Sequence, residues 1–321
     1  MTGRPDPGPV VPPPGAHGGD AEALARVLGV EPCDVLDLSV TMNPLASDIA
    51  PLVARHACDI RRYPQPSRAT RALSEALGVP SERLLLTNGG AEAIALVARE
   101  LRVASLVEPE FSLWRRHLVT VRSGAEARER DRVRSNPNNP TGVLAPEGAR
   151  AACWDEAFYA LATGHLTRGD AERGALVVGS FTKLFACPGL RLGYVIAPDA
   201  RLLEMIRARQ PEWSVSSIAL GVLPELLDGA PLVAWAREVA SLRGSLVSVL
   251  ERAGFAVDAA DAPWVLVREA AWLRPALGRL GILVRDCTSF GLPGTVRIAV
   301  PSPGPLERLA RGLELVVEDQ R

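Results

Sequence analysis

The chain has 321 residues, enough to bury a large core as one two-lobed domain or as two domains. Hydrophobic residues make up 47% and charged residues 23%, as in an ordinary soluble globular protein, and the net charge of −1 predicts neither a nucleic-acid nor a membrane partner. Five scattered cysteines favour free thiols in a reducing cytoplasm, and four histidines without ligand spacing argue against a metal site.

The chain opens with a proline-rich stretch, residues 1–15. This stretch, MTGRPDPGPVVPPPG, lacks the basic-then-apolar pattern of a signal sequence and carries too much proline to fold. We therefore expect a flexible segment. No apolar run along the sequence reaches the roughly 18 residues that a membrane helix needs, and we expect a cytoplasmic protein.

Between about residues 83 and 198, short β-rich runs alternate with helical or loop segments. Strands are predicted at 83–87, 104–109, a run ending at Asp155, 175–180 and 192–198. A helix is predicted at 91–102, directly after the turn NGG. This order predicts an α/β fold with a mostly parallel sheet and ligands at the strand ends.

The pattern changes after residue 198. Apolar residues recur at steps of three or four from Leu232 to Leu250, which predicts a long amphipathic helix. Strands are then predicted at 255–260, 264–269, 281–286 and 295–300, with helices at 270–280 and 305–319. We expect a large domain at 48–205 and a smaller α+β domain made of 16–47 and 206–321.

Two glycine- and asparagine-rich turns are typical of polar ligand sites. In TNGGAEAI (87–94), bare amides and a helix N-terminus follow a predicted strand and can face an anion, although most such turns are only turns. In NPNNPTG (136–142), two prolines fix the backbone and the asparagines offer donors and acceptors. A rigid structural loop is the alternative for this second segment.

Asp155, in WDEAFYAL, ends a predicted buried strand. A carboxylate there needs a cationic partner, or its burial is costly. A helix N-cap aspartate is the alternative interpretation.

Lys183 lies in SFTKLFACPGLRLGY (180–194) and is the one lysine of the chain, which has 35 arginines. An amine held among apolar side chains loses solvation of its charged form, which favours the neutral, nucleophilic amine. Such an amine attacks an aldehyde, whereas a guanidinium does not. A lysine that persists by chance is the alternative.

These four segments, in this order, resemble the pyridoxal-phosphate enzymes of fold type I, specifically class I and II aminotransferases. Ser180, Lys183 and Arg191 match the pattern S-x-x-K followed eight residues later by arginine. The resemblance implies a large domain (48–205) that binds pyridoxal 5'-phosphate, a smaller α+β domain, and a homodimer.

The resemblance also implies a role for each matching residue. Lys183 would bind the cofactor aldehyde covalently, Asp155 would pair with the protonated pyridine nitrogen, and Asn139 would hydrogen-bond the phenolic oxygen. Phe111 would stack on one face of the ring and Ala157 would pack on the other. The phosphate would be held by Gly90, Ala91, Ser180 and Arg191, with Tyr63 reaching it from the partner subunit.

For the substrate, Arg297 in TVRIAV matches the arginine that binds the α-carboxylate. Arg285 in GILVRDC is expected to bind a second anionic group, and Asn43 in DLSVTMNPL is expected to contact the substrate. The segments HGGD (17–20), DEAF (155–158) and PEWSV (211–215) are similar to threonine-phosphate decarboxylases of cobalamin biosynthesis and to the related histidinol-phosphate aminotransferases.

Phe158 stands where many aminotransferases carry a tyrosine, which favours the decarboxylase-like branch. Residues 114–136 and 142–155 are shorter than expected for the family, and Ser216 stands where decarboxylases often have asparagine. We therefore expect a decarboxylase-like lyase in a biosynthetic pathway, acting on an amino acid with a second anionic group. An aminotransferase is the first alternative, and a non-catalytic protein that keeps the fold is the second.

Overall fold

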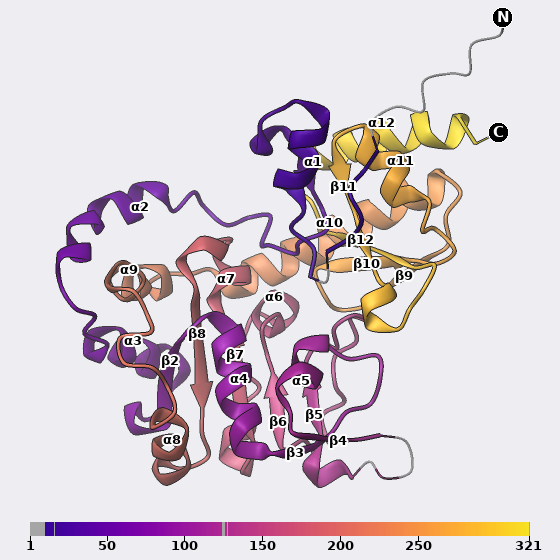
Figure 1. Cartoon of the computed structure of the whole chain (residues 1–321). Helices are drawn as coiled ribbons and strands as arrows, with labels where there is room; N and C mark the ends of the chain where they lie inside the picture. Colours follow the sequence, from indigo (N-terminus) through magenta and orange to yellow (C-terminus); the bar gives the residue numbers. More distant parts are fainter. Residues whose placement is uncertain (1–9, 16, 124–125, 127, 321) are drawn as a thin grey trace, which may run out of the picture. The chain divides into compact units, whose positions relative to one another are not determined.

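The computed structural model describes residues 10–15, 17–123, 126 and 128–320 (Figure 1). The described residues form two compact units. The large unit runs from Met42 to Val239, and the small unit joins the residues up to Thr41 with those from Ala240 onward.

The large unit contains, among the described residues, a five-stranded sheet in the order β2-β8-β7-β6-β5. Strand β8 runs antiparallel to both of its neighbours, whereas the pairs β5–β6 and β6–β7 are parallel, so the other four strands point one way. The mostly parallel sheet is confirmed. Its strands are β2 Leu84–Asn88, β5 Val133–Ser135, β6 Cys153–Asp155, β7 Leu176–Ser180 and β8 Leu192–Ile196.

A second, shorter pair of parallel strands extends this arrangement. Strands β3 (Val103–Ser105) and β4 (Thr120–Arg122) pair with each other, and a parallel bridge joins Ser105 to Arg132, next to β5.

Helices cover both faces of the five-stranded sheet. Side chains alternate along each strand, so Leu84 and Leu86 pack into one apolar cluster while Leu85 packs into another. Helices α3 and α9 contribute to the first cluster, and α4 and α8 to the second. The helices of this unit are α2 Ala50–Arg55, α3 Ser67–Leu77, α4 Gly89–Leu101, α5 Ser112–His117, α6 Tyr159–Thr163, α7 Phe181–Leu184, α8 Ala200–Arg207 and α9 Ser217–Leu227.

Residues 206–239, which the sequence boundaries give to the smaller domain, lie in the large unit. The reason is helix α9, whose Ala219, Val222 and Leu223 are buried in the first apolar cluster of the sheet. Ser216 caps this helix, because its hydroxyl accepts the backbone N–H of Ala219 at 3.1 Å. Helix α10 (Leu232–Arg252) then crosses from the large into the small unit.

The connection between the parallel strands β5 and β6, residues 136–152, contains no helix, and all of its residues are described. The side chain of Arg168 contacts this connection between β5 and β6. Its guanidinium lies 4.7 Å from the ring of the buried Trp154 and donates to the carbonyls of Pro146 and Glu147. A side chain therefore fixes a crossover for which parallel strands usually use a helix.

The free edge of β2 is closed by side chains. The carbonyl of Leu86 accepts from Gln210 Nε2 at 2.9 Å, and that of Leu84 accepts from Arg207 Nη2 at 3.4 Å. The backbone N–H of Asn88 donates to Glu92 at 2.7 Å. Two carbonyls and one amide of the edge strand are thus satisfied by side chains of α4, of α8 and of the segment that follows α8.

The small unit is an α+β structure. Its antiparallel sheet has the order β12-β13-β10-β9, and a separate parallel pair joins β1 to β11. The single strand predicted at 281–286 is two short strands that belong to these different sheets. The elements are α1 Ala21–Leu28, β1 Leu36–Asp37, β9 Val257–Ala259, β10 Trp264–Val267, α11 Leu273–Arg279, β11 Ile282–Leu283, β12 Arg285–Asp286, β13 Val296–Ala299 and α12 Pro303–Glu318.

Part of the N-terminal stretch is held on the small unit. The carbonyl of Pro12 accepts from the buried Arg274 at 2.6 Å, and that of Gly15 accepts from Arg285 at 2.9 Å. Val11 packs against the apolar cluster of Leu24. The expected flexibility of residues 1–9 lies outside the described residues.

In the described part of the chain, no single helix is long and apolar enough to cross a membrane; the bent pair α9 and α10 meets that test together, on length and composition alone.

Candidate active site

Three strands of the large unit bring the glycine-rich turn together with Ser180 and Arg191. Gly193 at the start of β8 pairs with Thr87 near the end of β2 on one side and with Ser180 at the end of β7 on the other. Because β2 and β7 point the same way, their carboxyl ends meet at one edge of the sheet. Helix α4 begins there, at Gly89.

The glycines of this turn make room for a close approach. A Cβ on Gly89 would lie 2.5 Å from Arg191 Nη2, and one on Gly90 would lie 3.2 Å from the Cβ of Ser180. Gly89 also has φ of +74°, which favours glycine. Amides at the start of α4, the Ser180 hydroxyl and a guanidinium therefore converge, as an oxyanion requires. Ala91 lies exposed in the first turn of the same helix.

Glu92, which the sequence did not single out, fixes this turn. One oxygen, Oε2, accepts from the backbone of Asn88 at 2.7 Å, from Gln210 at 3.0 Å and from the hydroxyl of Ser214 at 3.1 Å. The carboxylate thereby ties the start of α4 to the segment that follows α8.

Asp155 is buried at the end of β6. Its carboxylate accepts from Trp114 Nε1 at 3.3 Å and from the backbone N–H of Ala157 at 3.2 Å. Burial raises the pKa of Asp155 to about 6, although both hydrogen bonds act in the opposite direction. The donors that contact its carboxylate are an indole N–H and a backbone N–H, and neither is a cation.

A second buried carboxyl, Glu110, joins the loops that carry Phe111 and Asn139. It accepts the backbone N–H of Phe111 at 2.7 Å and that of Ser135 at 2.9 Å, and the Ser135 hydroxyl donates to it as well. The same hydroxyl accepts the backbone N–H of Asn139 at 2.8 Å. Burial raises the pKa of Glu110 to about 7, and the charge of Asp155 also raises it.

Glu156, which follows Asp155 in the chain, is as buried as Glu110, and burial raises its pKa to about 7. It accepts the backbone N–H of Arg168 at 3.1 and 3.3 Å, and so belongs to a different loop.

Lys183 lies half-buried in the short helix α7, between the buried Thr182 and Leu184. Asn43 holds the end of this helix, because its backbone N–H donates to the Lys183 carbonyl and its Nδ2 donates to the Leu184 carbonyl, both at 2.9 Å. Its Oδ1 accepts the backbone N–H of Leu45. The structure thus shows Asn43 fixing the helix that carries the lysine.

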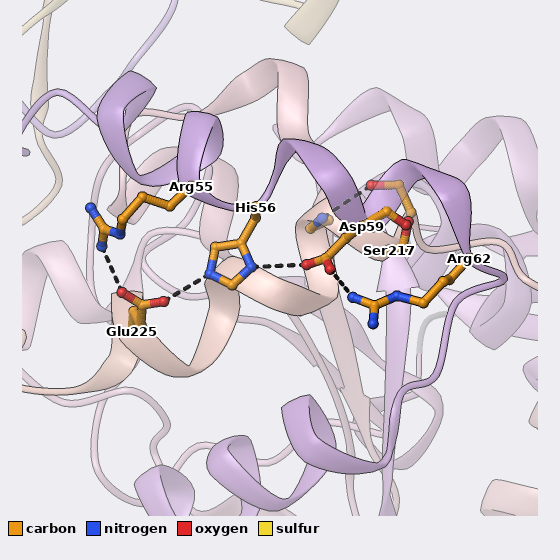
Figure 2. A network of polar contacts seen from close by, with 8 residues as sticks. Arg55, His56, Asp59, Arg62, Ser217 and Glu225 are labelled. Atoms are coloured by element: carbon orange, nitrogen blue, oxygen red, sulfur yellow. Dashed lines mark hydrogen bonds and ion pairs between the residues drawn. The ribbon is translucent and has the colours of Figure 1, made fainter.

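Tyr63 is exposed, and its ring centroid lies 4.7 Å from that of the exposed Trp213. The segment before it is fixed by a network of charges, shown in Figure 2. His56 contacts Asp59 at 2.9 Å and Glu225 of α9 at 2.8 Å. Both carboxylates raise the pKa of His56. Arg55 pairs with Glu225 at 2.7 Å and Arg62 with Asp59, which completes the network.

In the small unit, Arg285 and Arg297 are directly opposite each other on β12 and β13, and both are buried. The guanidinium of Arg297 lies 4.9 Å from the ring of Trp264, and both guanidiniums lie within 5.6 Å of the ring of Phe290. Burial lowers the pKa of Arg297 to about 10, and the charge of Arg285 also lowers it. Arg285 donates to the carbonyl of Gly15 and to the hydroxyl of Ser289, both at 2.9 Å.

The residues of the large unit fit pyridoxal phosphate. The turn at Gly89, which a methyl group would fill, suits the phosphate. Asp155 is a buried carboxyl suited to a ring N–H, and Lys183 is the chain's one ε-amine.

Comparisons with known proteins agree with this fit. Residues 126–314 match the family model "Aminotransferase class I and II". Threonine-phosphate decarboxylase of Salmonella typhimurium is 30% identical over 357 aligned positions, covering 94% of this chain and 96% of the relative. Because 357 exceeds the chain's 321 residues, gaps fall within this chain.

Histidinol-phosphate aminotransferase 2 of Pseudomonas aeruginosa is 27% identical, covering 95% of each chain. The solved structure of L-threonine-O-3-phosphate decarboxylase from Porphyromonas gingivalis is similar in fold, with a TM-score of 0.77 and 24% identity over 88% of this chain and all of that one. The chain therefore belongs to the aminotransferase class I and II family, whose enzymes depend on pyridoxal phosphate, as the resemblance implied.

Proposed function

We propose that the protein is a pyridoxal-phosphate enzyme that breaks a bond at the α-carbon of an amino acid carrying a second anionic group, with decarboxylase-like chemistry. The observation that carries the substrate class is the pair Arg285 and Arg297. Both guanidiniums are buried and stand directly opposite each other on adjacent strands, an arrangement that suits a ligand with two anionic groups.

In this proposal the large unit binds the cofactor. The amides of Gly90 and Ala91, the hydroxyl of Ser180 and the guanidinium of Arg191 hold the phosphate. Phe111 and Ala157 pack on the two faces of the ring, and Asn139 donates to its phenolic oxygen. The bound cofactor supplies an electron sink for the pair of electrons left at the α-carbon.

Asp155 holds the proton on the ring nitrogen as an ion pair. Burial alone favours the neutral form of Asp155. A protonated ring nitrogen would supply the cation that a buried carboxylate needs. The amine of Lys183 would hold the cofactor through its aldehyde and, as a free amine, would move a proton at the α-carbon.

Arg297 binds the α-carboxylate, and Arg285 binds the second anionic group, a phosphate or a carboxylate. Planar guanidinium groups suit such oxyanions, and strands β12 and β13 hold them firmly. Asn43 contacts the substrate through the second hydrogen of Nδ2.

Two features support decarboxylation over transamination. Phe158 stands where many aminotransferases carry a tyrosine, and the 30% identical relative is a decarboxylase. Aminotransferase activity is the second candidate, because other relatives of 26–28% identity are histidinol-phosphate aminotransferases.

We also propose a cytoplasmic homodimer in which Tyr63 reaches the phosphate of the partner subunit. Its exposure, beside the exposed Trp213, supports this assignment.

The test is a panel of amino acids and O-phospho amino acids, with and without 2-oxoglutarate, with products followed by mass spectrometry. Decarboxylation appears as loss of CO₂ in the absence of 2-oxoglutarate. Transamination requires 2-oxoglutarate as the amino-group acceptor. Arg297→Ala should weaken every substrate about 10- to 100-fold, whereas Arg285→Ala should weaken only doubly anionic ones. If Arg285→Ala has no effect with the best substrate, the second anionic group is wrong.

A further inference from the structure

One buried side chain contacts both loops that flank the proposed cofactor ring. Glu110 Oε1 accepts the backbone N–H of its neighbour Phe111 at 2.7 Å and the hydroxyl hydrogen of Ser135. Its Oε2 accepts the backbone N–H of Ser135 at 2.9 Å. Three donors from two separate chain segments therefore converge on a side chain that is 3% exposed.

The hydroxyl of Ser135 extends this contact to the second loop. It donates to Glu110 and accepts the backbone N–H of Asn139 at 2.8 Å. Asn138 adds a further link, because its Nδ2 donates to the carbonyl of Pro109 at 3.1 Å. The two loops are thus connected through Glu110 and Ser135, and separately through Asn138.

Ser135 is also placed beside Asp155. The two residues are register partners in the parallel pair β5–β6, and the backbone N–H of residue 136 donates to the Asp155 carbonyl at 2.8 Å. Ser135, which donates to Glu110, therefore lies at the same edge of the sheet as Asp155, the proposed partner of the ring nitrogen.

We propose that Glu110 is a positioning residue for the cofactor site, which fixes Phe111 directly and Asn139 through Ser135. This inference rests on the proposed function, because the roles of Phe111 and Asn139 toward the ring belong to it. Glu110 itself touches neither cofactor nor substrate. It holds the ring-stacking side chain and the donor to the phenolic oxygen in one fixed relation.

The substitution Glu110→Gln tests this with almost no change in size. A carboxylate offers two acceptors, whereas an amide offers one acceptor and two donors. If the amide oxygen replaces Oε1, the N–H of Ser135 faces an NH₂ group; if it replaces Oε2, the N–H of Phe111 does. Either orientation breaks a backbone contact.

Glu156→Gln is the matched control. Glu156 is also 3% exposed and also accepts a backbone N–H, but its partner is Arg168 on another loop. Both oxygens of Glu156 share this one N–H, so the amide oxygen of glutamine can keep the bond. Glu156→Gln therefore controls for replacing a buried carboxyl by an amide, and only Glu110→Gln must break a backbone hydrogen bond on the loops of Phe111 and Asn139.

The first measurement is hydrogen exchange in the cofactor-free protein, by mass spectrometry of peptides covering residues 109–112 and 135–141. Above about pH 8, where a carboxyl with a pKa of about 7 is ionised, Glu110→Gln should accelerate exchange in these peptides about 10- to 100-fold, the effect of losing a hydrogen bond to a charged group. Glu156→Gln should not. Ser135→Ala should accelerate exchange at Asn139 but not at Phe111, because it removes only the relay.

The second measurement is cofactor affinity, with the visible circular dichroism of the bound cofactor as a report of ring orientation. Glu110→Gln should weaken affinity about 10- to 100-fold and reduce the signal per bound cofactor, while Glu156→Gln leaves both near wild type. Faster exchange without any change in affinity or dichroism would overturn the inference, as would unchanged exchange in both Glu110→Gln and Ser135→Ala. Wild-type protein that binds no cofactor would instead overturn the proposed function, before any variant is compared.

Discussion

The turn between β2 and α4 allows a direct test of the phosphate site. In Gly89→Ala, the new methyl group would lie 2.5 Å from Arg191 Nη2 and 2.9 Å from its Cζ, far inside van der Waals contact, so the guanidinium must move. The backbone conformation alone costs alanine about 1–2 kcal/mol of stability. Loss of one charge-assisted hydrogen bond to the phosphate costs about 1.5–3 kcal/mol of binding, or roughly 10- to 100-fold in the dissociation constant.

Gly78→Ala separates these two effects. Gly78 ends α3 with φ of +65°, close to the +74° of Gly89, and a Cβ there would meet nothing within 4 Å. Both variants should lower the free energy of unfolding similarly in urea titrations. Only Gly89→Ala should weaken cofactor binding, measured by quenching of tryptophan fluorescence in cofactor-free protein. Equal cofactor affinities in the two variants would refute the placement of the phosphate beside Arg191.

Four further outcomes are expected. Borohydride reduction of cofactor-loaded protein should label the peptide that contains Lys183, and Lys183→Ala should show no label; an unlabelled wild type would contradict the assignment. Asp155→Ala should greatly reduce turnover while Lys183 is still labelled, and near-normal activity would mean that the ring nitrogen lies elsewhere. His56 has its pKa raised above 6.5 by two carboxylates, so its protonated form stabilises the fold fully below 6.5, and this contribution is lost as pH rises through the folded value. His56→Gln should therefore lower the free energy of unfolding more at about pH 5.5 than at about pH 9, and an equal loss at both would argue against the charged network. Light scattering should give twice the mass of the chain. Obligate dimers commonly bury more than about 2,000 Å², so the dimer should persist at working dilution. An active monomer would exclude a site completed by the partner's Tyr63.

Much of the large unit could be predicted because its candidate site residues end strands or directly follow them. Asp155 and Ser180 end neighbouring strands, and the strand periods were readable from the sequence. The direction of β8 was not readable, because the same apolar run suits either direction. The split of 281–286 into two strands likewise depends on which partners lie beside each residue.

The supporting residues escaped the sequence for a different reason. Glu92 and Glu110 accept backbone N–H groups 4 and 25 positions away in the chain. Asn43 was expected to contact the substrate, but its hydrogen bond to the carbonyl of Leu184, 141 positions away, could not be foreseen. Nothing in EPEF distinguishes a glutamate buried against another loop from one in water. Such roles exist only once the fold has brought the donors to the acceptor.

The closed edge of β2 has a consequence for how the protein behaves in concentrated solution. An apolar strand with free backbone groups is a template for pairing with a second chain, which leads to aggregation. Strand β2 contains a run of three leucines. The side chains of Gln210 and Arg207 donate hydrogen bonds to the carbonyls of Leu86 and Leu84 in this run. We therefore expect these two side chains to hinder pairing of this strand edge with another chain. Shortening both should increase aggregation through β2.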